Sequence, residues 1–413
     1  MEKLKSKKPL IRFPEFKDNW QQKQLSELLS EAKKRNGDLK YGKEEVLSVS
    51  GEYGVINQIE HLGRSYAGVS VHNYNVVETD NIIYTKSPLK ENPFGIIKLN
   101  KGKAGIVSTL YAVYNVNKQT ASGSFIDCYF SLDANTNRYL RPLVRKGAKN
   151  TLQIGNDEFI KGEIFAPTIP EQKRIASFFI LLDKKISELK QKKNLLEQYK
   201  KGVMQNIFSQ NLRFKEDNGK EFPKWEKKNL KELTTLITKG TTPKYFSPTG
   251  INFIKIECFQ NERITNEKCL FIDEKTHTKE LKRSMLVEGD LLFAIAGATI
   301  GKCDFVKKEI LPANTNQALA IIRLKENVNA LFVYHNLKSN RMKKYIVDNI
   351  TTGAQPNLNL EQIGNFSIPY PSVAEQIKIS NLFSSIDNKI IQTQIQILQT
   401  EQYKKGLLQN MFI

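Results

Sequence analysis

Apolar side chains recur at every third and fourth position in two long stretches of this chain, residues 168–209 and 372–413. The other positions carry mostly Lys, Glu, Gln and Asn, so each stretch predicts an amphipathic helix of about 40 residues, roughly 60 Å long if straight. A narrow apolar stripe of this length needs a partner helix. The positions that we expect to face that partner are Ile175, Phe179, Leu182, Ile186 and Leu189 in the first helix and Ile379, Phe383, Ile386 and Ile390 in the second.

The two helical stretches are copies of one another. Glu171 matches Glu375 at an offset of 204 positions, and the copies align without a gap. Both begin with a hydroxyl residue three positions before that glutamate, which predicts a reciprocal capping box. Two unrelated surface helices would not share this alignment, so we expect the copies to pair antiparallel with each other. Further matched pairs are Asp183 with Asp387, Tyr199 with Tyr403 and Gln205 with Gln409.

The repeat extends to the segment that opens each half. Trp20 matches Trp225 at an offset of 205 positions, and short motifs with an Arg-Phe pair precede both. Between these segments and the helices, short β-branched and aromatic runs are interrupted by Gly, Asn and Pro, which is typical of mixed β structure. The sequence therefore predicts an α+β fold with a pseudo-two-fold internal repeat, in which two mixed-β domains are separated by two long antiparallel helices. The expected domains are residues 1–166, 167–210, 211–370 and 371–413.

Charge changes this picture by indicating a polyanionic partner. The chain has 63 Lys and Arg against 43 Asp and Glu, which gives a net charge of +20. Such an excess of positive charge favours nucleic acid as the partner, with an anionic membrane as the second candidate. No apolar run approaches 18 residues, and no apolar segment follows the basic start, so we expect neither a membrane span nor a signal peptide. Four scattered cysteines without a paired motif indicate reduced thiols, and hence a cytoplasmic protein.

Catalytic and metal-binding motifs are not convincing in this sequence. Residues 297–302, GATIGK, have one residue too few between the glycines for a phosphate-binding loop, and Cys303 follows where Ser or Thr is required. The four histidines have neither paired spacing nor cysteine neighbours. We therefore expect no catalytic residue, no metal site and no cofactor bound by this chain.

Loops that combine cations with amides or small hydroxyls are candidates for reading DNA, because cations neutralise phosphates while amides and hydroxyls reach base edges. In the first domain the candidates are Lys33, Lys34, Arg35, Lys86, Arg138, Arg141, Arg145, Lys146, Lys149 and Asn150. In the second domain they are Lys239, Thr241, Thr242, Lys244, Tyr245, Thr299, Lys302, Asn314, Thr315, Gln317, Gln355 and Asn357.

These features resemble one family over essentially the whole chain. The openings with RFPEF and Trp, the helix starts TIPEQKRIA and AEQIKIS, the loop KGTTPKY and the hairpin GDLLFAIAGATIGK are similar to the specificity (S) subunit of type I restriction–modification systems. The resemblance implies that each globular domain is a target recognition domain for one half of an interrupted, asymmetric site in double-stranded DNA. It implies that the helices set the spacing and dock two methylation subunits. S-adenosylmethionine, ATP and Mg²⁺ would then belong to those subunits and to the restriction subunits, which supply the motor and nuclease.

Other functions remain open at this point. A related restriction system with fused nuclease and methylase partners would use a similar specificity subunit. A stand-alone DNA-binding regulator would bind its site without partners, whereas apolar residues beside the main helix stripe (Ile391, Ile395 and Leu398) favour further protein contacts. An enzyme in its own right would need the catalytic motifs that the sequence lacks.

Overall fold

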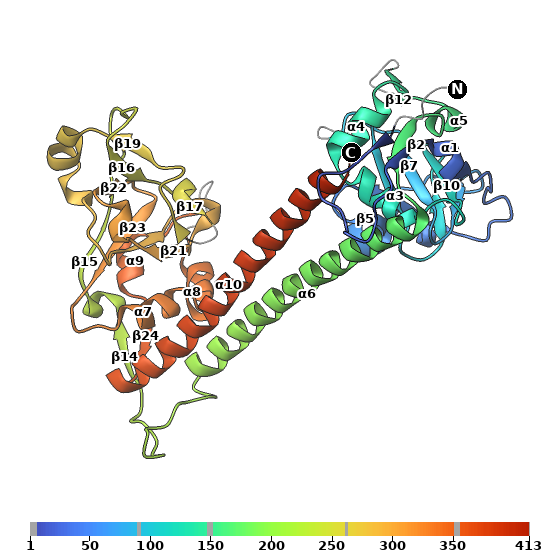
Figure 1. The fold of residues 1–413 in the computed structure, drawn as a ribbon. Coiled ribbons are helices and arrows are strands. Elements are labelled where there is room, and N and C mark those ends of the chain that lie inside the picture. The colour runs from blue at the N-terminus through green and yellow to red at the C-terminus, as the bar shows by residue number, and fades with distance from the viewer. Residues whose placement is uncertain (1–5, 89–91, 147–151, 261–262, 351–355, 413) are drawn as a thin grey trace. The chain divides into compact units, whose positions relative to one another are not determined.

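The computed structural model describes residues 6–88, 92–146, 152–260, 263–350 and 356–412. Two compact units make up the chain (Figure 1). The first unit combines Met1–Gln191 with Gln394–Ile413, and the second is Lys192–Thr393. Each unit therefore contains one β-rich domain, the first part of one long helix and the last part of the other.

The first unit is built around a four-stranded antiparallel sheet with the strand order β3-β10-β7-β8. Its hydrophobic core lies between this sheet, the short helices and the ends of the two long helices. The strands of the unit are β1 (Ser6–Lys7), β2 (Trp20–Gln24), β3 (Leu29–Glu31), β4 (Leu47–Ser50), β5 (Gly54–Asn57), β6 (Asn75–Val77), β7 (Ile82–Thr85), β8 (Ile96–Leu99), β9 (Gly105–Val107), β10 (Tyr111–Val116), β11 (Arg145–Lys146), β12 (Leu152–Gln153) and β13 (Glu163–Ala166). Its short helices are α1 (Leu25–Leu28), α2 (Gln58–Leu62), α3 (Gly123–Phe130), α4 (Asp133–Leu140) and α5 (Asn156–Phe159).

The second unit contains a four-stranded antiparallel sheet with the order β15-β23-β20-β21 and a smaller mixed sheet with the order β19-β16-β22. Its strands are β14 (Glu226–Asn229), β15 (Thr234–Lys239), β16 (Ile251–Ile254), β17 (Phe259–Gln260), β18 (Arg263–Ile264), β19 (Leu270–Ile272), β20 (Leu291–Ala294), β21 (Cys303–Phe305), β22 (Ala313–Thr315), β23 (Leu319–Leu324) and β24 (Ser367–Tyr370). Its short helices are α7 (Ala330–Leu337), α8 (Asn340–Asn349) and α9 (Leu360–Gly364).

The two domains share one topology although their sequences match weakly. In each, the strand that opens the domain pairs antiparallel with the strand that precedes the long helix, β2 with β13 and β14 with β24. The four-stranded sheets then follow the same order, and a pair of helices follows each sheet, α3–α4 and α7–α8. The predicted α+β fold with an internal repeat is confirmed.

The long helices are α6 (Ile169–Phe208) and α10 (Val373–Met411), of 40 and 39 residues. The division into two compact units differs from the four predicted segments because each helix contributes to both units. Segments close to both ends of the chain contact each other in the first unit, where Ile11 N–H donates to the carbonyl of Asn410 at 3.0 Å.

Candidate nucleic-acid interface and helix seam

Within each unit the two long helices are joined by apolar side chains. In the first unit, Ile175 and Phe179 of α6 share a buried cluster with Leu408, Met411 and Phe412 at the end of the chain. In the second unit, Ile379 and Phe383 of α10 share a cluster with Met204, Ile207 and Phe208. The last three residues of each set are repeat equivalents, so the same apolar contact is made twice.

Ion pairs repeat across this contact between the two long helices, which we call the helix seam. Lys404 Nζ lies 2.5 Å from Asp183 Oδ1 in the first unit, and Lys200 Nζ lies 2.5 Å from Asp387 Oδ1 in the second. In the first unit Lys190 also pairs with Glu401 at 2.7 Å. Since residues later in α6 pair with residues earlier in α10, the helices run antiparallel within each unit. Of the residues expected at the seam, Ile175, Phe179, Ile186, Ile379, Phe383 and Ile386 are buried, and Leu182, Leu189 and Ile390 are partly buried.

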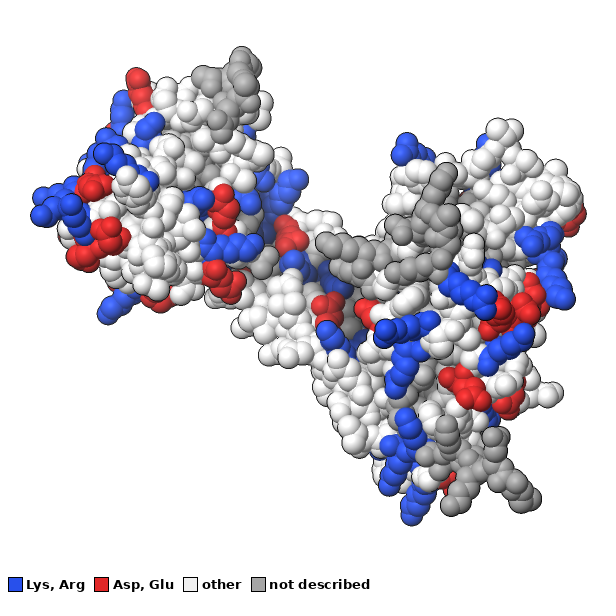
Figure 2. Space-filling model, turned by 90° about the horizontal axis from the view of Figure 1, so that it is seen from above, with Lys and Arg blue, Asp and Glu red and all other residues white. Residues whose placement is uncertain are grey.

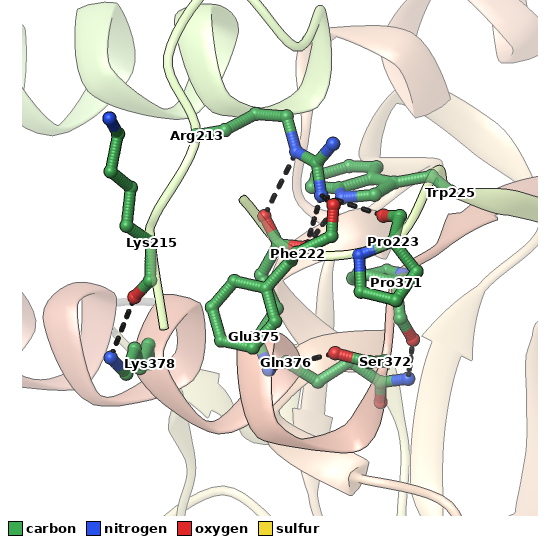
Figure 3. Close-up of polar contacts among 10 residues, drawn as sticks. All are labelled: Arg213, Lys215, Phe222, Pro223, Trp225, Pro371, Ser372, Glu375, Gln376 and Lys378. Atoms are coloured by element: carbon green, nitrogen blue, oxygen red, sulfur yellow. Dashed lines mark hydrogen bonds and ion pairs between the residues drawn. The ribbon is translucent and has the colours of Figure 1, made fainter. Parts of the chain in front are cut away.

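A polar corner anchors the start of α10 to the segment that opens the second half (Figure 3). Arg213 donates from Nε to Glu375 Oε1 at 3.2 Å and from Nη2 to Oε2 at 2.7 Å, and Trp225 Nε1 donates to Oε2 at 2.8 Å. The Glu375 side chain is fully buried. The hydrogen bonds to Glu375 raise the pKa of Arg213, so the ion pair is present at any neutral pH.

The first half repeats this corner at the start of α6. Arg12 donates to both carboxylate oxygens of Glu171 at 2.7 Å, and Trp20 Nε1 donates to Oε1 at 3.2 Å. A buried carboxylate is stable only when it is paired and hydrogen-bonded, so these two corners fix the direction in which each long helix leaves its domain.

The prediction that the glutamate carboxylates complete the capping boxes is wrong. Glu375 N–H does donate to Ser372 Oγ at 3.4 Å, but the carboxylates of Glu171 and Glu375 turn to the Arg and Trp of their corners. A buried guanidinium requires a carboxylate as its counter-charge. The amides at a helix N-terminus do not require one, because other groups can accept their hydrogen bonds. The repeated Arg and Trp of the opening segments were the sequence signal for this site.

Most of the described candidate residues of the second domain lie at one end of the β15-β23-β20-β21 sheet. Lys239 ends β15 opposite Ala320, and Ala294 ends β20 opposite Leu319, so both following loops leave the sheet where β23 begins. Gly240 lies so close to Thr315 that a Cβ atom would be 1.7 Å from the Thr315 carbonyl oxygen. Only glycine therefore allows the loop at 239–245 to approach the loop at 315–317.

Contacts between side chains hold these loops together. Thr242 Oγ1 donates to Gln317 Oε1 at 2.7 Å, and Arg283, which the sequence analysis did not single out, donates to Thr241 Oγ1 at 3.2 Å. Tyr245 is 82% exposed. Thr299 is half-buried, and the other exposed candidates are Lys239, Thr241, Thr242, Lys244, Lys302, Gln317 and Asn357.

Asn314 and Thr315 are fully buried, which corrects the expectation that they present their side chains to DNA. The Asn314 amide donates to the Leu281 carbonyl at 2.9 Å and to Ser284 Oγ at 3.2 Å, and Thr315 Oγ1 donates to the Ile254 carbonyl at 2.9 Å. Both belong to strand β22, whose polar side chains satisfy buried backbone groups.

In the first domain the corresponding sheet end carries the loops after β3 and β7. Lys33, Lys34 and Arg35 follow β3 and are exposed. Lys86 follows β7, but its ammonium donates inward to the Ile154 carbonyl at 2.9 Å and to Asn156 Oδ1 at 2.5 Å. Burial lowers the pKa of Lys86, as expected for an ammonium removed from water.

Arg138 of α4 and Arg141, which directly follows α4, border the same region of the first domain. Arg138 and Arg141 are exposed and line a concavity of about 790 Å³ together with Phe94, which belongs to the loop between β7 and β8. Arg145 is exposed as well. Lys149, Asn150 and Gln355 lie outside the described residues, as does the side chain of Lys146.

Charged residues of both signs cover the domains. On the face shown in Figure 2, Lys and Arg are interspersed with Asp and Glu rather than forming one uninterrupted basic surface.

The described residues contain no group of three or more His, Cys, Asp or Glu side chains that could hold a metal ion. None of the helices in the described residues is long and apolar enough to cross a membrane.

Comparisons with known proteins agree with the resemblance seen in the sequence. The sequence model of the family described as type I restriction modification DNA specificity domain matches residues 223–400. The type I restriction enzyme MjaVIII specificity subunit of Methanocaldococcus jannaschii is 28% identical over 253 residues, which cover 59% of each chain. The EcoBI specificity subunit of Escherichia coli is 30% identical over 133 residues, 32% of this chain and 27% of the relative. The chain thus spans between 27% and 59% of the length of the curated relatives it matches.

Solved structures share the fold over nearly the whole chain. The type I restriction–modification S subunit from M. genitalium covers 98% of this chain, with a TM-score of 0.58 and 13% identity. A chain from a structural study of complex assembly and conformational transition in the type I system covers 94%, with a TM-score of 0.56 and 15% identity. The family model and the curated relatives together show that this chain is similar to type I restriction–modification specificity subunits, and the solved structures show the same fold.

Proposed function

We propose that this chain is the DNA sequence-specificity subunit of a type I restriction–modification complex. The observation that carries the proposal is that, in both domains, loops rich in cations, amides and hydroxyls leave the same end of topologically equivalent sheets. A sheet end built in this way presents several loops to one ligand, and the loops differ between the domains while the scaffold is repeated. Each domain would then read one half of an interrupted, asymmetric site.

Docking of partner subunits is supported by apolar residues that the long helices leave exposed. In the first unit these are Ile180, Leu181, Ile395 and Leu398, and in the second they are Leu195, Val373, Ile377 and Ile391. Tyr199 and Tyr403 are repeat equivalents and are 57% and 56% exposed. Exposed apolar groups in such numbers mark protein–protein contacts, and repeated ones fit two copies of the same partner.

We further propose that this chain recognises DNA but performs no chemistry itself. Two methylation subunits would bind S-adenosylmethionine, and restriction subunits would use ATP and Mg²⁺. Methylation of a base within duplex DNA requires that the base be extruded into a catalytic pocket, so a catalytic partner has to dock beside each reading domain.

The purified chain should transfer no methyl group to DNA when it is given labelled S-adenosylmethionine alone. The same chain with its methylation subunits should transfer the label to DNA at specific sites. The measurement is incorporation of label, followed by mapping of the modified bases. Methyl transfer by the chain alone would contradict the proposal, and tight, site-specific DNA binding without any partner would favour a stand-alone regulator instead.

Lengthening both long helices should widen the gap between the two half-sites. Each unit holds parts of both helices, so seven residues are inserted in both, after Lys190 and after Gln394, which keeps the apolar stripe in register. Seven residues add roughly 10 Å of helix, or about three base pairs at 3.4 Å each. Mapping of methylated bases should show unchanged half-sites with a longer gap; an unchanged gap would show that the helices do not set the spacing.

A further inference from the structure

Two buried cysteines lie against each other in the second unit. Cys258 ends the short helix η4 (Ile256–Cys258), and Cys269 directly precedes β19. Their Sγ atoms are 3.0 Å apart, and both residues belong to one buried apolar cluster. The first domain contains a single cysteine, Cys128, so the scaffold that the two domains share does not require this pair. We call Cys258 and Cys269 the cysteine pair.

Polar neighbours give the two thiols of the cysteine pair different roles. Cys258 Sγ accepts hydrogen bonds from the Cys269 thiol at 3.0 Å and from Lys255 N–H at 3.3 Å, and the Cys269 thiol also lies 3.2 Å from the Thr265 carbonyl. The bond from Cys269 lowers the pKa of Cys258, whereas this same bond together with burial raises the pKa of Cys269. Since the thiolate is the reactive form of cysteine, Cys258 is the nucleophile of the pair.

The distance between the two sulfur atoms is close to that of a covalent link. A disulfide bond is about 2.05 Å long, so the sulfurs need to approach each other by only about 1 Å. Proteins of reducing compartments use such links mainly as transient redox sensors. We propose that Cys258 and Cys269 form a reversible disulfide when the protein is exposed to hydrogen peroxide. This modification goes beyond the proposed function and does not depend on it.

Hydrogen peroxide is small and uncharged, and it reaches the pair where Cys269 is 8% exposed. The Cys258 thiolate attacks one peroxide oxygen, the O–O bond breaks, and the hydroxide that leaves takes up a proton to become water. The Cys269 sulfur then attacks the sulfenic acid on Cys258, whose hydroxyl group leaves with the Cys269 proton as a second water. Two thiols are thereby oxidised to one disulfide while one peroxide is reduced to two waters. A thiol reductant reverses the bond by thiol–disulfide exchange.

The disulfide would fix a part of the second domain that supports the candidate reading loops. It joins residues 11 positions apart, and the strands β17 and β18 lie between them. These strands are held to β21, because Asp304 accepts from Ile264 N–H at 2.9 Å and pairs with Arg263 at 3.4 Å. The cysteine pair also shares its buried cluster with Ala294 and Leu319, where candidate reading loops leave the sheet.

The test exposes the full chain, purified with its methylation subunits, to increasing concentrations of hydrogen peroxide. The remaining thiols are alkylated, and the chain is digested with trypsin without reductant. Mass spectrometry should find the tryptic peptides 256–263 and 269–275 joined, and dithiothreitol should separate them. The proposal is overturned if Cys258 and Cys269 stay alkylatable at peroxide concentrations that oxidise the urea-unfolded chain, or if Cys258 is converted to sulfinic acid instead.

Unfolding provides a second measurement. Closing a loop of this length increases the ratio of folded to unfolded protein roughly hundredfold. After oxidation, the unfolding transition of the second unit should therefore shift to a higher urea concentration in the wild type. Each variant is compared in its oxidised and reduced forms, so that the effect of the substitution itself cancels.

Cys128→Ala is the matched control, because Cys128 lies in the first unit and should leave both the joined peptides and the shift unchanged. Cys269→Ala should show neither of them. A wild type whose unfolding does not shift on oxidation, or a shift of equal size in Cys269→Ala, contradicts the proposal.

Discussion

Residues 1–210, expressed with the methylation subunits but without the second half, should direct methylation to a palindromic site. The truncated chain keeps α6 but loses the last part of α10, so Trp20, Phe125 and Phe179 lose their contacts with Phe412. The truncation removes Leu408, Met411 and Phe412 from the first unit. A second truncated chain can restore their contacts, because its Met204, Ile207 and Phe208 are the repeat equivalents of these three residues. The result is a two-fold symmetric dimer.

The polar contacts of the seam are preserved in this dimer. Lys200 replaces Lys404 as the partner of Asp183, and Glu197 replaces Glu401 as the partner of Lys190. The weak position is Lys193, which takes the place of the buried Ile397 and costs stability. Symmetry of the protein is mirrored in its DNA site, so both half-sites should be the one read by the first domain.

Mapping of methylated bases distinguishes the outcomes. Methylation of the original asymmetric site by the truncated chain would contradict the idea that each half is a reading unit. Lys193→Ile is a matched variant, because it restores the apolar side chain that the second copy carries at this position. It should strengthen the truncated dimer, measured by sedimentation, without changing the palindromic sequence that is modified.

Glu375→Gln should destabilise the second unit by about 3 kcal/mol, the range found when one partner of a buried ion pair is removed. The neutral amide leaves Arg213 without its counter-charge, and its NH₂ group cannot accept the hydrogen bonds that Glu375 Oε1 and Oε2 now accept. Glu171→Gln should do the same to the first unit, where Arg12 and Trp20 donate to Glu171. The measurement is urea unfolding followed by fluorescence of Trp20 and Trp225, one in each unit.

Asp217→Asn is the control for both variants. Asp217 pairs with Lys378 at 2.6 Å close to the corner of the second unit, but its side chain is 97% exposed. Exposed ion pairs contribute little to stability, so this variant should unfold like the wild type. Equal unfolding curves for Glu375→Gln and Asp217→Asn would show that the buried corner does not hold the helix to its domain.

The sequence analysis was most informative where its signal was periodic and repeated. The apolar stripe of each long helix extends over about ten turns, so single residues that depart from the pattern do not obscure it. The ungapped repeat indicated that the two helices are equivalent. The family resemblance and the α+β fold are confirmed. The individual DNA-contacting residues stay predictions. The sequence could not show that the candidate loops of each domain lie close together, because their proximity depends on the order of the strands in the sheet.

What the sequence by itself determined is the repeat, the helices, the basic character and the family resemblance, because each depends on residue type and spacing along the chain. Only the tertiary structure decided which polar residues are used internally. Asn314, Thr315, Glu171 and Glu375 have polar side chains that could face water or a ligand, yet all four are buried and hydrogen-bonded. Burial depends on contacts between residues far apart in sequence, such as Arg12 with Glu171, and a buried polar group must find its partner there.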